Sequence, residues 1–368
     1  MRGIRRYTAA TLAVAVCVAW VAPSAAQAPL QLSPPVVQPS HKPAAKPAAK
    51  PAANPKSRKP VQPAQKEPSP EAAGAPLTAA PAATGGDVDL AYGAYQRGLY
   101  ITAFALATRR VEDKSDIKAM TLLGELYANG YGIARDDVKA AEWYRLAADR
   151  GDREAMFALA MFHLGGRAGP VNRDESTKLL AAAAKLGHSA AAYDLGLLYL
   201  EGQLFPQDAA RAAEMFRAAA QAGNREAQYA LATLYKEGRG VPKDLTEAAR
   251  LLAASALADY PDAQVEYAIA LFNGTGVAKD EAAAVALLKK AARQGSPIAQ
   301  NRLANVLASG RGVAADPVEA IKWHLVSRAG GATDLGLDDF MRRQQPDIRA
   351  AGEKAAQPWL EALKQPRS

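Results

Sequence analysis

The segment "ANGYGIARDDVKAAEWYRLAADRG", residues 128–151, decides the fold, because nearly the same pattern returns farther along the chain. It returns as "KEGRGVPKDLTEAARLLAASALAD" at residues 236–259, which is 108 positions later. Each segment predicts the end of one helix at a glycine, then a short loop, then a second helix. Self-similarity at a fixed spacing is typical of stacked repeat proteins.

Small residues show that the period is 36. One position is alanine and another is glycine in six consecutive units: Ala119, Ala155, Ala191, Ala227, Ala263 and Ala299, and Gly130, Gly166, Gly202, Gly238, Gly274 and Gly310. Five residues after each of these alanines comes another glycine or alanine, which lets two backbones approach closely. The two quoted segments are therefore units one and four of an array without insertions.

The landmarks of each unit have physical causes. In the first helix of unit one, Ala119, Leu123 and Leu126 fall on one face at helical spacing. Glycines such as Gly130 and Gly132 then predict a loop with positive φ. The second helix is predicted to begin at a capping side chain in every unit: Asp136, Asn172, Asp208, Asp244, Asp280 and Asp316.

These residues resemble the Sel1-like repeat (SLR) family, α-helical solenoid relatives of tetratricopeptide repeats. Trp143 and Trp323 occupy the family's tryptophan position in units one and six, whereas the loops "GGRAGPV" and "GQLFPQD" of units two and three depart from the pattern. Unit four matches the pattern through Ala227, Tyr229, Leu231, Tyr235, Gly238, Gly240, Val241 and Asp244. The resemblance implies an all-α fold and a role in assembling protein complexes.

We therefore predict an all-α, right-handed α-solenoid of six 36-residue helix-turn-helix repeats over residues 119–334. Residues 87–118 look like a degenerate helical pair before the repeats. Residues 335–368 look like a capping helix and tail that cover the last apolar face. Solenoids need such modified ends, because a terminal unit has a neighbour on one side only.

Residues 1–26 have the pattern of a secretory signal peptide. "MRGIRR" is basic, "AATLAVAVCVAWVA" is apolar, and "PSAA" predicts cleavage after Ala26. The apolar run is shorter than the roughly 20 residues needed to span a bilayer, although an uncleaved inner-membrane tether stays an alternative. Cys17 is the only cysteine, so cleavage leaves no disulfide and no cysteine-bound metal. We expect a periplasmic or secreted protein without a stable membrane span.

Residues 27–86 differ sharply in composition, because they hold 14 of the chain's 24 prolines and the repeated segment "KPAAKPAAKPAA". Proline at every fourth residue forbids helix and favours extended polyproline II, which predicts a disordered Pro/Ala/Lys-rich linker. Residues 1–26 contribute +3 and residues 27–86 contribute +5, which accounts for the whole formal charge of +8. The repeats are therefore neutral as a group, and we expect no nucleic-acid partner.

Catalytic and metal-binding patterns are missing from the sequence. The repeats contain only the histidines His163, His188 and His324, for which we predict core packing, a helix start and a structural role respectively. The capping acid recurs in nearly every unit, whereas a catalytic acid is needed once. We expect no enzyme activity, no cofactor and no metal.

A binding surface is the remaining hypothesis, and first helices commonly line the concave side of a solenoid. The positions equivalent to 122, 125 and 129 point away from the packed face on a helical wheel. In units three to five they combine acids with Leu197 and Ile269, which suits a basic and apolar partner, although ordinary solvated positions would look the same. The candidate residues are Glu125, Asp194, Leu197, Glu201, Glu237, Glu266, Ile269 and Asn273.

Two functions follow from this organisation. A signal peptide followed by such repeats is similar in architecture to a periplasmic regulator of exopolysaccharide production that restrains a sensor kinase, so the first is an envelope adaptor or regulator that binds a protein. The alternative is a factor that binds peptidoglycan or another anionic envelope polymer through its basic, proline-rich linker.

Overall fold

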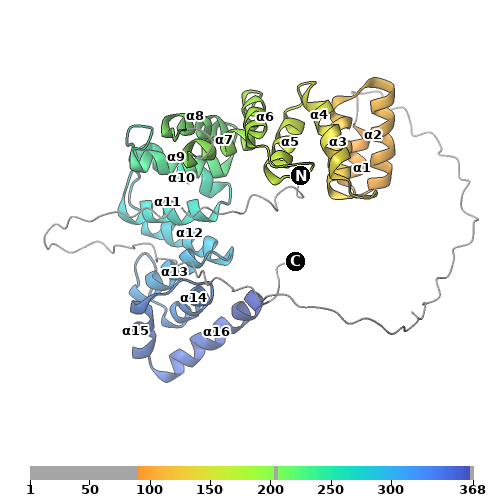
Figure 1. The fold of residues 1–368 in the computed structure, drawn as a ribbon. Helices are drawn as coiled ribbons and strands as arrows, with labels where there is room; N and C mark the ends of the chain where they lie inside the picture. Colours follow the sequence, from red (N-terminus) through yellow and green to blue (C-terminus); the bar gives the residue numbers. More distant parts are fainter. Residues whose placement is uncertain (1–88, 203–205, 365–368) are drawn as a thin grey trace, which may run out of the picture. The chain divides into compact units, whose positions relative to one another are not determined.

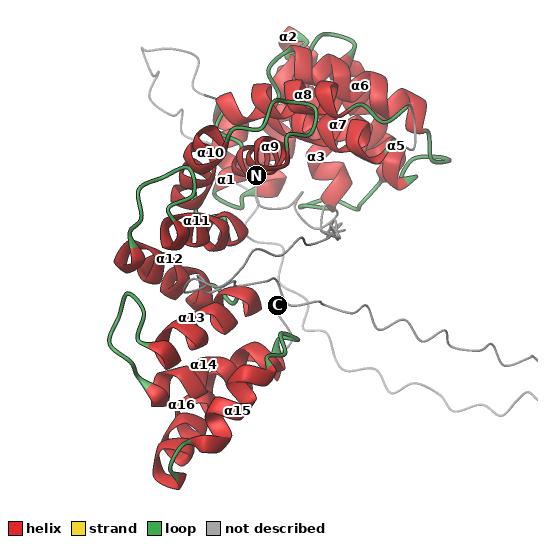
Figure 2. Ribbon diagram, turned by 90° about the vertical axis from the view of Figure 1, so that its left-hand side faces the viewer, coloured by secondary structure: helices red, strands yellow, loops and turns green. Residues whose placement is uncertain are grey.

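The computed structural model describes residues 89–202 and 206–364, and all regular elements within these two ranges are α-helices (Figure 2). The predicted signal segment and the predicted linker lie outside the described residues.

Six pairs of helices form the repeats. Their first helices are α3 (Ile117–Asn129), α5 (Arg153–Gly165), α7 (Ser189–Glu201), α9 (Arg225–Glu237), α11 (Pro261–Asn273) and α13 (Pro297–Ser309). Their second helices are α4 (Asp137–Ala148), α6 (Arg173–Lys185), α8 (Ala209–Gln221), α10 (Leu245–Leu257), α12 (Glu281–Arg293) and α14 (Pro317–Ala329).

From α1 to α14, consecutive helices pack against one another in chain order (Figure 1). Each first helix packs on the second helix of its own unit, and that second helix packs on the first helix of the next unit. The buried core follows the array: Leu123 clusters with Ala107 near the beginning, and Leu288 clusters with Leu303 near the end. The predicted all-α array of six 36-residue units is confirmed.

Side-chain caps fix where the helices begin. All six predicted second-helix caps accept hydrogen bonds from backbone N–H groups of the first turn, as Asp244 does from Thr246 and Glu247. The structure adds a second series of caps, on the first helices. Its members accept from the N–H three residues later and are Asp116, Asp152, His188, Asn224 and Ser296. The sixth member, Tyr260, provides no side-chain cap.

The second glycine of the loop within a unit serves contacts between units. Gly276 has φ +70°, and a Cβ there would overlap the carbonyl oxygen of Leu245 at the start of the preceding second helix, α10. A Cβ at Gly312 would lie 2.6 Å from the carbonyl oxygen of Glu281 in the same way. Positive φ alone explains why a glycine suits these loops, and close approach between neighbouring units explains why no side chain fits.

Unit two lacks this second glycine and is connected differently. Arg167 stands in its loop and donates a hydrogen bond of 2.7 Å to the carbonyl oxygen of Ala128 in the preceding unit. The same guanidinium pairs with Asp137 and lies over the ring of Phe162, 4.0 Å from its centre. The departure from the repeat pattern is thus compensated by a cation that bridges units one and two.

Both ends of the array carry extra helices. Before the repeats lie α1 (Leu90–Gln96) and α2 (Tyr100–Lys114), in agreement with the predicted degenerate pair. After them the prediction of one capping helix is wrong, because α15 (Leu335–Arg343) and α16 (Pro346–Lys364) are separate. Helix α15 ends at its C-cap, Gln344, which is extended. Pro346 disfavours helical dihedrals at Gln345, the residue directly before it, so the helix does not continue into α16. Helix α16 packs on α14, where Trp359 and Trp323 lie 4.9 Å apart between ring centres.

Candidate protein-binding surface

The outward surface of the first helices, which we call the first-helix face, contains the candidate residues at different depths. The exposed candidates are Glu201, Glu237 and Asn273, and the half-buried candidates are Glu125, Asp194, Leu197, Glu266 and Ile269. One prediction about this face is wrong. The first of its three positions is buried in three units, as Leu122, Ala158 and Arg302. Leu122 packs in the same cluster as Ala103 and Ala107, because the neighbouring helix pair covers it.

Glu125 makes internal hydrogen bonds. Its carboxylate accepts from the Tyr95 hydroxyl of α1 at 3.3 Å and from the Tyr144 hydroxyl of α4 at 3.1 Å. Asn129 also donates to it, at 2.9 Å. Burial, together with the nearby Glu125 charge, raises the pKa of Tyr95 and Tyr144. Glu125 therefore connects the N-terminal pair to the first repeat.

Aromatic rings and carboxylates gather where α7 meets α9. Tyr193 packs on Phe216, with ring centres 5.6 Å apart. Burial raises the pKa of Tyr193 to about 12, and the carboxylates of Asp194 and Glu226 add to the shift. Burial also raises the pKa of Asp194 to about 7, and the nearby His188 only partly opposes this. At neutral pH Asp194 therefore carries only part of its charge.

The same kind of environment continues from α9 to α11. The rings of Tyr229 and Tyr260 lie 5.3 Å apart, and burial followed by surrounding carboxylates raises the pKa of both hydroxyls. Burial raises the pKa of Asp262, against the lowering effect of a hydrogen bond with the Tyr260 side chain. We call the residues of α7, α9, α11 and the turn before α11 the acidic tyrosine cluster; they are Tyr193, Asp194, Glu226, Tyr229, Tyr260 and Asp262.

Cations neutralise only part of this negative charge. Arg225 pairs with Glu226 at 3.0 Å and its guanidinium lies 6.0 Å from the centre of the Tyr260 ring. Next to the cluster, Lys236 of α9 pairs with Glu266 of α11 at 2.6 Å, which joins units four and five. The cluster itself thus contains three carboxyl groups against the single cation of Arg225.

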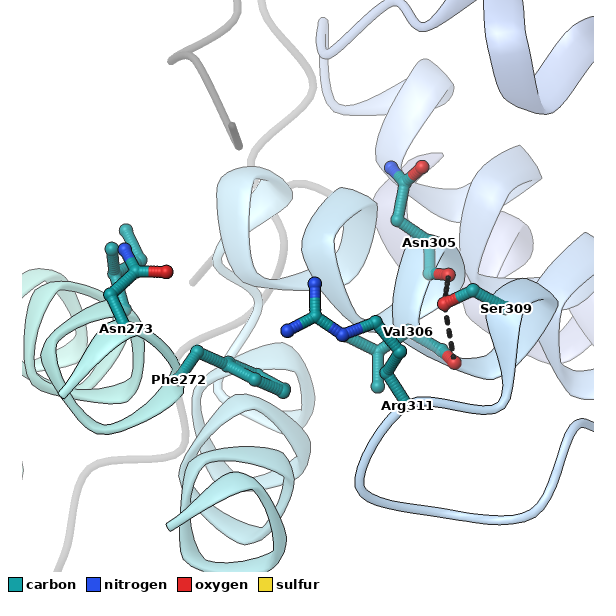
Figure 3. Close-up of a pocket in the computed structure, with 7 residues that line it drawn as sticks. Phe272, Asn273, Asn305, Val306, Ser309 and Arg311 are labelled. Carbon is teal, nitrogen blue, oxygen red and sulfur yellow. Dashed lines mark hydrogen bonds between the residues drawn. The ribbon is translucent and has the colours of Figure 1, made fainter. Parts of the chain in front are cut away.

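A hollow lies between α11 and α13, and the candidates Ile269 and Asn273, one turn apart on α11, both line it. Figure 3 shows Asn273 on one side of this hollow and Asn305 on the other. Arg311, in the loop after α13, pairs with Glu281 at 2.9 Å and extends over Phe272. Apolar groups, amides, a hydroxyl and a guanidinium are therefore combined in one small depression. The lining residues are Ile269, Phe272, Asn273, Asn305, Val306, Ser309 and Arg311.

Comparison with known proteins identifies the repeats. The Sel1 repeat model matches six consecutive segments: 117–152, 153–188, 189–224, 225–260, 261–296 and 297–326. The chain belongs to the Sel1 repeat family. Each segment except the shorter last one begins with the first residue of a first helix and ends at the cap of the next. Sel1 repeat proteins generally mediate protein–protein interactions.

One solved Sel1 structure shares the fold, and a second is similar in sequence. A Sel1 repeat protein from Oxalobacter formigenes is 24% identical with a TM-score of 0.56, over 64% of this chain and 94% of its own. The protein c5321, a protective antigen of uropathogenic Escherichia coli with an SLR fold, is 24% identical with a TM-score of 0.49, over 73% of this chain and 68% of its own. A search of curated proteins found no match.

Two of the three histidines in the Sel1 repeats make structural contacts through their ring nitrogens. His188 caps α7, as expected for a helix start, and its Nε2 lies 3.1 Å from Glu154. His324 is buried on α14 with its Nε2 2.8 Å from Asp338 of α15. His163 is half-buried, and its Nε2 has no hydrogen-bond partner among the described residues.

Within residues 89–202 and 206–364, no three histidine, cysteine, aspartate or glutamate side chains are grouped so that they can hold a metal ion. None of the helices in these ranges has the length and apolar character needed to cross a membrane. Sequence reasoning missed the Lys236–Glu266 pair and, apart from His188, the caps of the first helices, although these caps recur with the same 36-residue period as the glycines.

Proposed function

We propose that this Sel1 repeat protein is an adaptor or regulator of the cell envelope that binds a protein partner on its first-helix face. The observation that carries the proposal is the contrast between two sets of positions. Packing positions repeat from unit to unit, as Ala227, Ala263 and Ala299 do, and are fully buried. The exposed ends of the first helices instead change, from Glu201 and Glu237 to Asn273.

The chemistry of the face supports a partner segment with basic and apolar residues. The acidic tyrosine cluster offers incompletely paired carboxylates beside aromatic rings, and such surfaces attract cations by charge and by cation–π contact. The hollow at the C-terminal end of α11 adds the apolar side chains of Ile269, Phe272 and Val306. An extended peptide that places a lysine or arginine on the cluster and an apolar side chain in the hollow satisfies both.

The envelope location is supported by sequence alone. Residues 1–26 have the three regions of a secretory signal, and residues 27–86 have the composition of a long tether. A tether between the point of export or anchorage and the repeats lets the binding face reach a partner in a membrane complex. A sensor or another envelope assembly fits this arrangement.

Affinity capture tests the proposal. The variant Glu201→Lys, Glu237→Lys, Asp262→Lys changes two exposed acids at the ends of first helices and one acid of the acidic tyrosine cluster. Asp194 and Glu266 are left unchanged, because Asp194 is half-buried and Glu266 is paired with Lys236. Crosslinking and capture from envelope extracts should recover a partner with the natural protein and lose most of it with this variant. The natural complex should also weaken as salt rises, since the Debye length falls from about 10 Å at 0.1 M to about 3 Å at 1 M.

The matched control reverses the same number of charges elsewhere. Glu142, Glu214 and Glu353 are exposed acids on α4, α8 and α16. Their replacement by lysine changes the net charge equally and should leave capture intact. If this control loses the partner and the face variant keeps it, binding belongs to another surface.

The second candidate function is binding of peptidoglycan or another anionic envelope polymer, and the observation in its favour is the charge of +5 on residues 27–86. A protein that lacks residues 27–86 separates the two functions. The adaptor keeps its protein partner after the deletion. The polymer-binding factor no longer sediments with purified peptidoglycan.

A further inference from the structure

His188 is unusual among the caps of the first helices. The other side chains that cap a first helix are carboxylate, amide or hydroxyl groups, and they accept a hydrogen bond without a change of charge near neutral pH. His188 accepts instead through a ring nitrogen: the Ala191 N–H donates to its Nδ1 at 3.0 Å. An imidazole accepts through Nδ1 only while that nitrogen carries no proton.

The geometry fixes the tautomer of His188. Because Nδ1 accepts from Ala191, the ring proton is on Nε2, which donates to the Glu154 carboxylate of α5 at 3.1 Å. The ring is stacked on Phe157, with centres 4.4 Å apart, and the residue is only 8% exposed. The neutral ring therefore connects the start of α7 to α5 of the preceding unit.

Charged groups surround this junction. From α5 come Glu154 and Arg153, whose guanidinium donates to the Leu186 carbonyl oxygen at 3.1 Å. The hydrogen bond from His188 is the largest cause that lowers the pKa of Glu154, which stays ionised as the pH falls toward 5. Helix α6 contributes Lys185 in its last turn, and α7 contributes Asp194.

We propose that the junction between units two and three is an acid-responsive switch, in which protonation of His188 replaces the cap of α7 with an ion pair to Glu154. A protonated ring presents an N–H to the Ala191 N–H, so the cap is lost. The positive end of the α7 dipole also faces the new cation. The ion pair with Glu154 holds the ring, so the first turn of α7 opens rather than the contact with α5.

A second protonation, at Asp194, accompanies the protonation of His188. The pKa of Asp194, raised to about 7 by burial one turn into α7, means that this carboxyl also gains a proton as the medium becomes mildly acidic. Protonation of His188 adds a positive charge and protonation of Asp194 removes a negative one, so both make the net charge near the start of α7 more positive. The proposed switch does not depend on the proposed binding of a protein partner.

The test is nuclear magnetic resonance of the full chain between pH 8 and pH 5. The amide resonance of Ala191 should move with the same midpoint as the His188 ring protons. Its protection against hydrogen exchange, corrected for the intrinsic pH effect, should fall on the order of fivefold, which corresponds to the loss of a typical cap. Ala155 and Ala227 are internal controls, since Asp152 and Asn224 cap them with bonds of 2.7 Å.

His188→Asn is the matched variant, because asparagine fills the same position in unit four and caps α9 there. The variant should fold, keep Ala191 protected at both pH values and show no titration at this amide. The proposal is overturned if the Ala191 amide does not follow His188, if Ala155 responds equally, if His188 stays neutral to pH 5, or if His188→Asn shows the same acid response.

Discussion

At the scale of single residues, the contact between Gly196 and Phe216 shows how closely the two helices of one unit approach. A Cβ at Gly196 would lie 2.6 Å from the Phe216 ring, and Gly124 stands in the same relation to Tyr144. In three other units the glycine is alanine, and a smaller leucine takes the place of the ring. These pairs are Ala160 with Leu180, Ala232 with Leu252, and Ala268 with Leu288. The two positions are therefore complementary in volume.

We predict that Gly196→Ala destabilises the protein by about 1–3 kcal/mol, because the added methyl group overpacks the contact with Phe216. Adding Phe216→Leu should restore part of the loss by recreating the alanine and leucine pair of the other units. Thermal unfolding of the two single variants and the double variant measures the coupling. Additive effects would show that the two positions do not form one contact.

Residue identity alone did not reveal every role. The spacing of Asp244 was enough to predict a cap, since its function is local in the chain. Glu125 looked like an outward acid, but Tyr95 and Tyr144 are brought to it from other helices. A contact between residues 19 or 30 positions apart depends on how separate helices pack, and a helical wheel describes only one helix.

At the scale of elements, the loops separate two costs of replacing glycine. Gly151 ends α4 with φ +90° and has open space where a Cβ would be. Gly276 has a similar φ, but a Cβ there overlaps backbone at the start of α10 in the neighbouring unit. Gly151 is therefore favoured only by its positive φ. Gly276 is favoured both by its positive φ and by the lack of room for a Cβ.

We predict that Gly151→Ala costs about 1–2 kcal/mol, the strain of an L-residue at positive φ. Gly276→Ala should cost about 1–3 kcal/mol more, because neither of the two overlapping backbones yields without a shift between units. Denaturant unfolding of both variants measures the difference. Equal losses would mean that the contact between units four and five relaxes freely.

At the scale of the whole molecule, the array is stabilised mainly by contacts between neighbouring helices. Removal of residues 225–260 deletes one unit and joins Asn224 to Pro261, so that a side chain able to cap precedes α11. We predict a folded, shorter protein with the same helicity per residue and a cooperative thermal transition by circular dichroism. Removal of residues 225–242 deletes α9 alone, leaves α10 without its partner and should abolish that transition.

The sequence by itself determined the all-α array, its six units, their register and the caps of the second helices. These features depend on residues close together in the chain, and the same residue pattern occurs in every unit with a period of 36. From the sequence we also predicted that the binding surface lies on the first helices, and this stays a prediction. The sequence did not determine which of those positions are accessible, and it gave one terminal helix where Pro346 separates two.

Only the tertiary structure decided the roles that depend on two units at once. It placed Glu154 beside His188, Lys236 beside Glu266, and Ile269 with Asn305 on one hollow. The physical reason is that helical periodicity fixes the direction of a side chain relative to its own helix. The distance and rotation between neighbouring helices come from the volumes packed between them, which follow only from the assembled array.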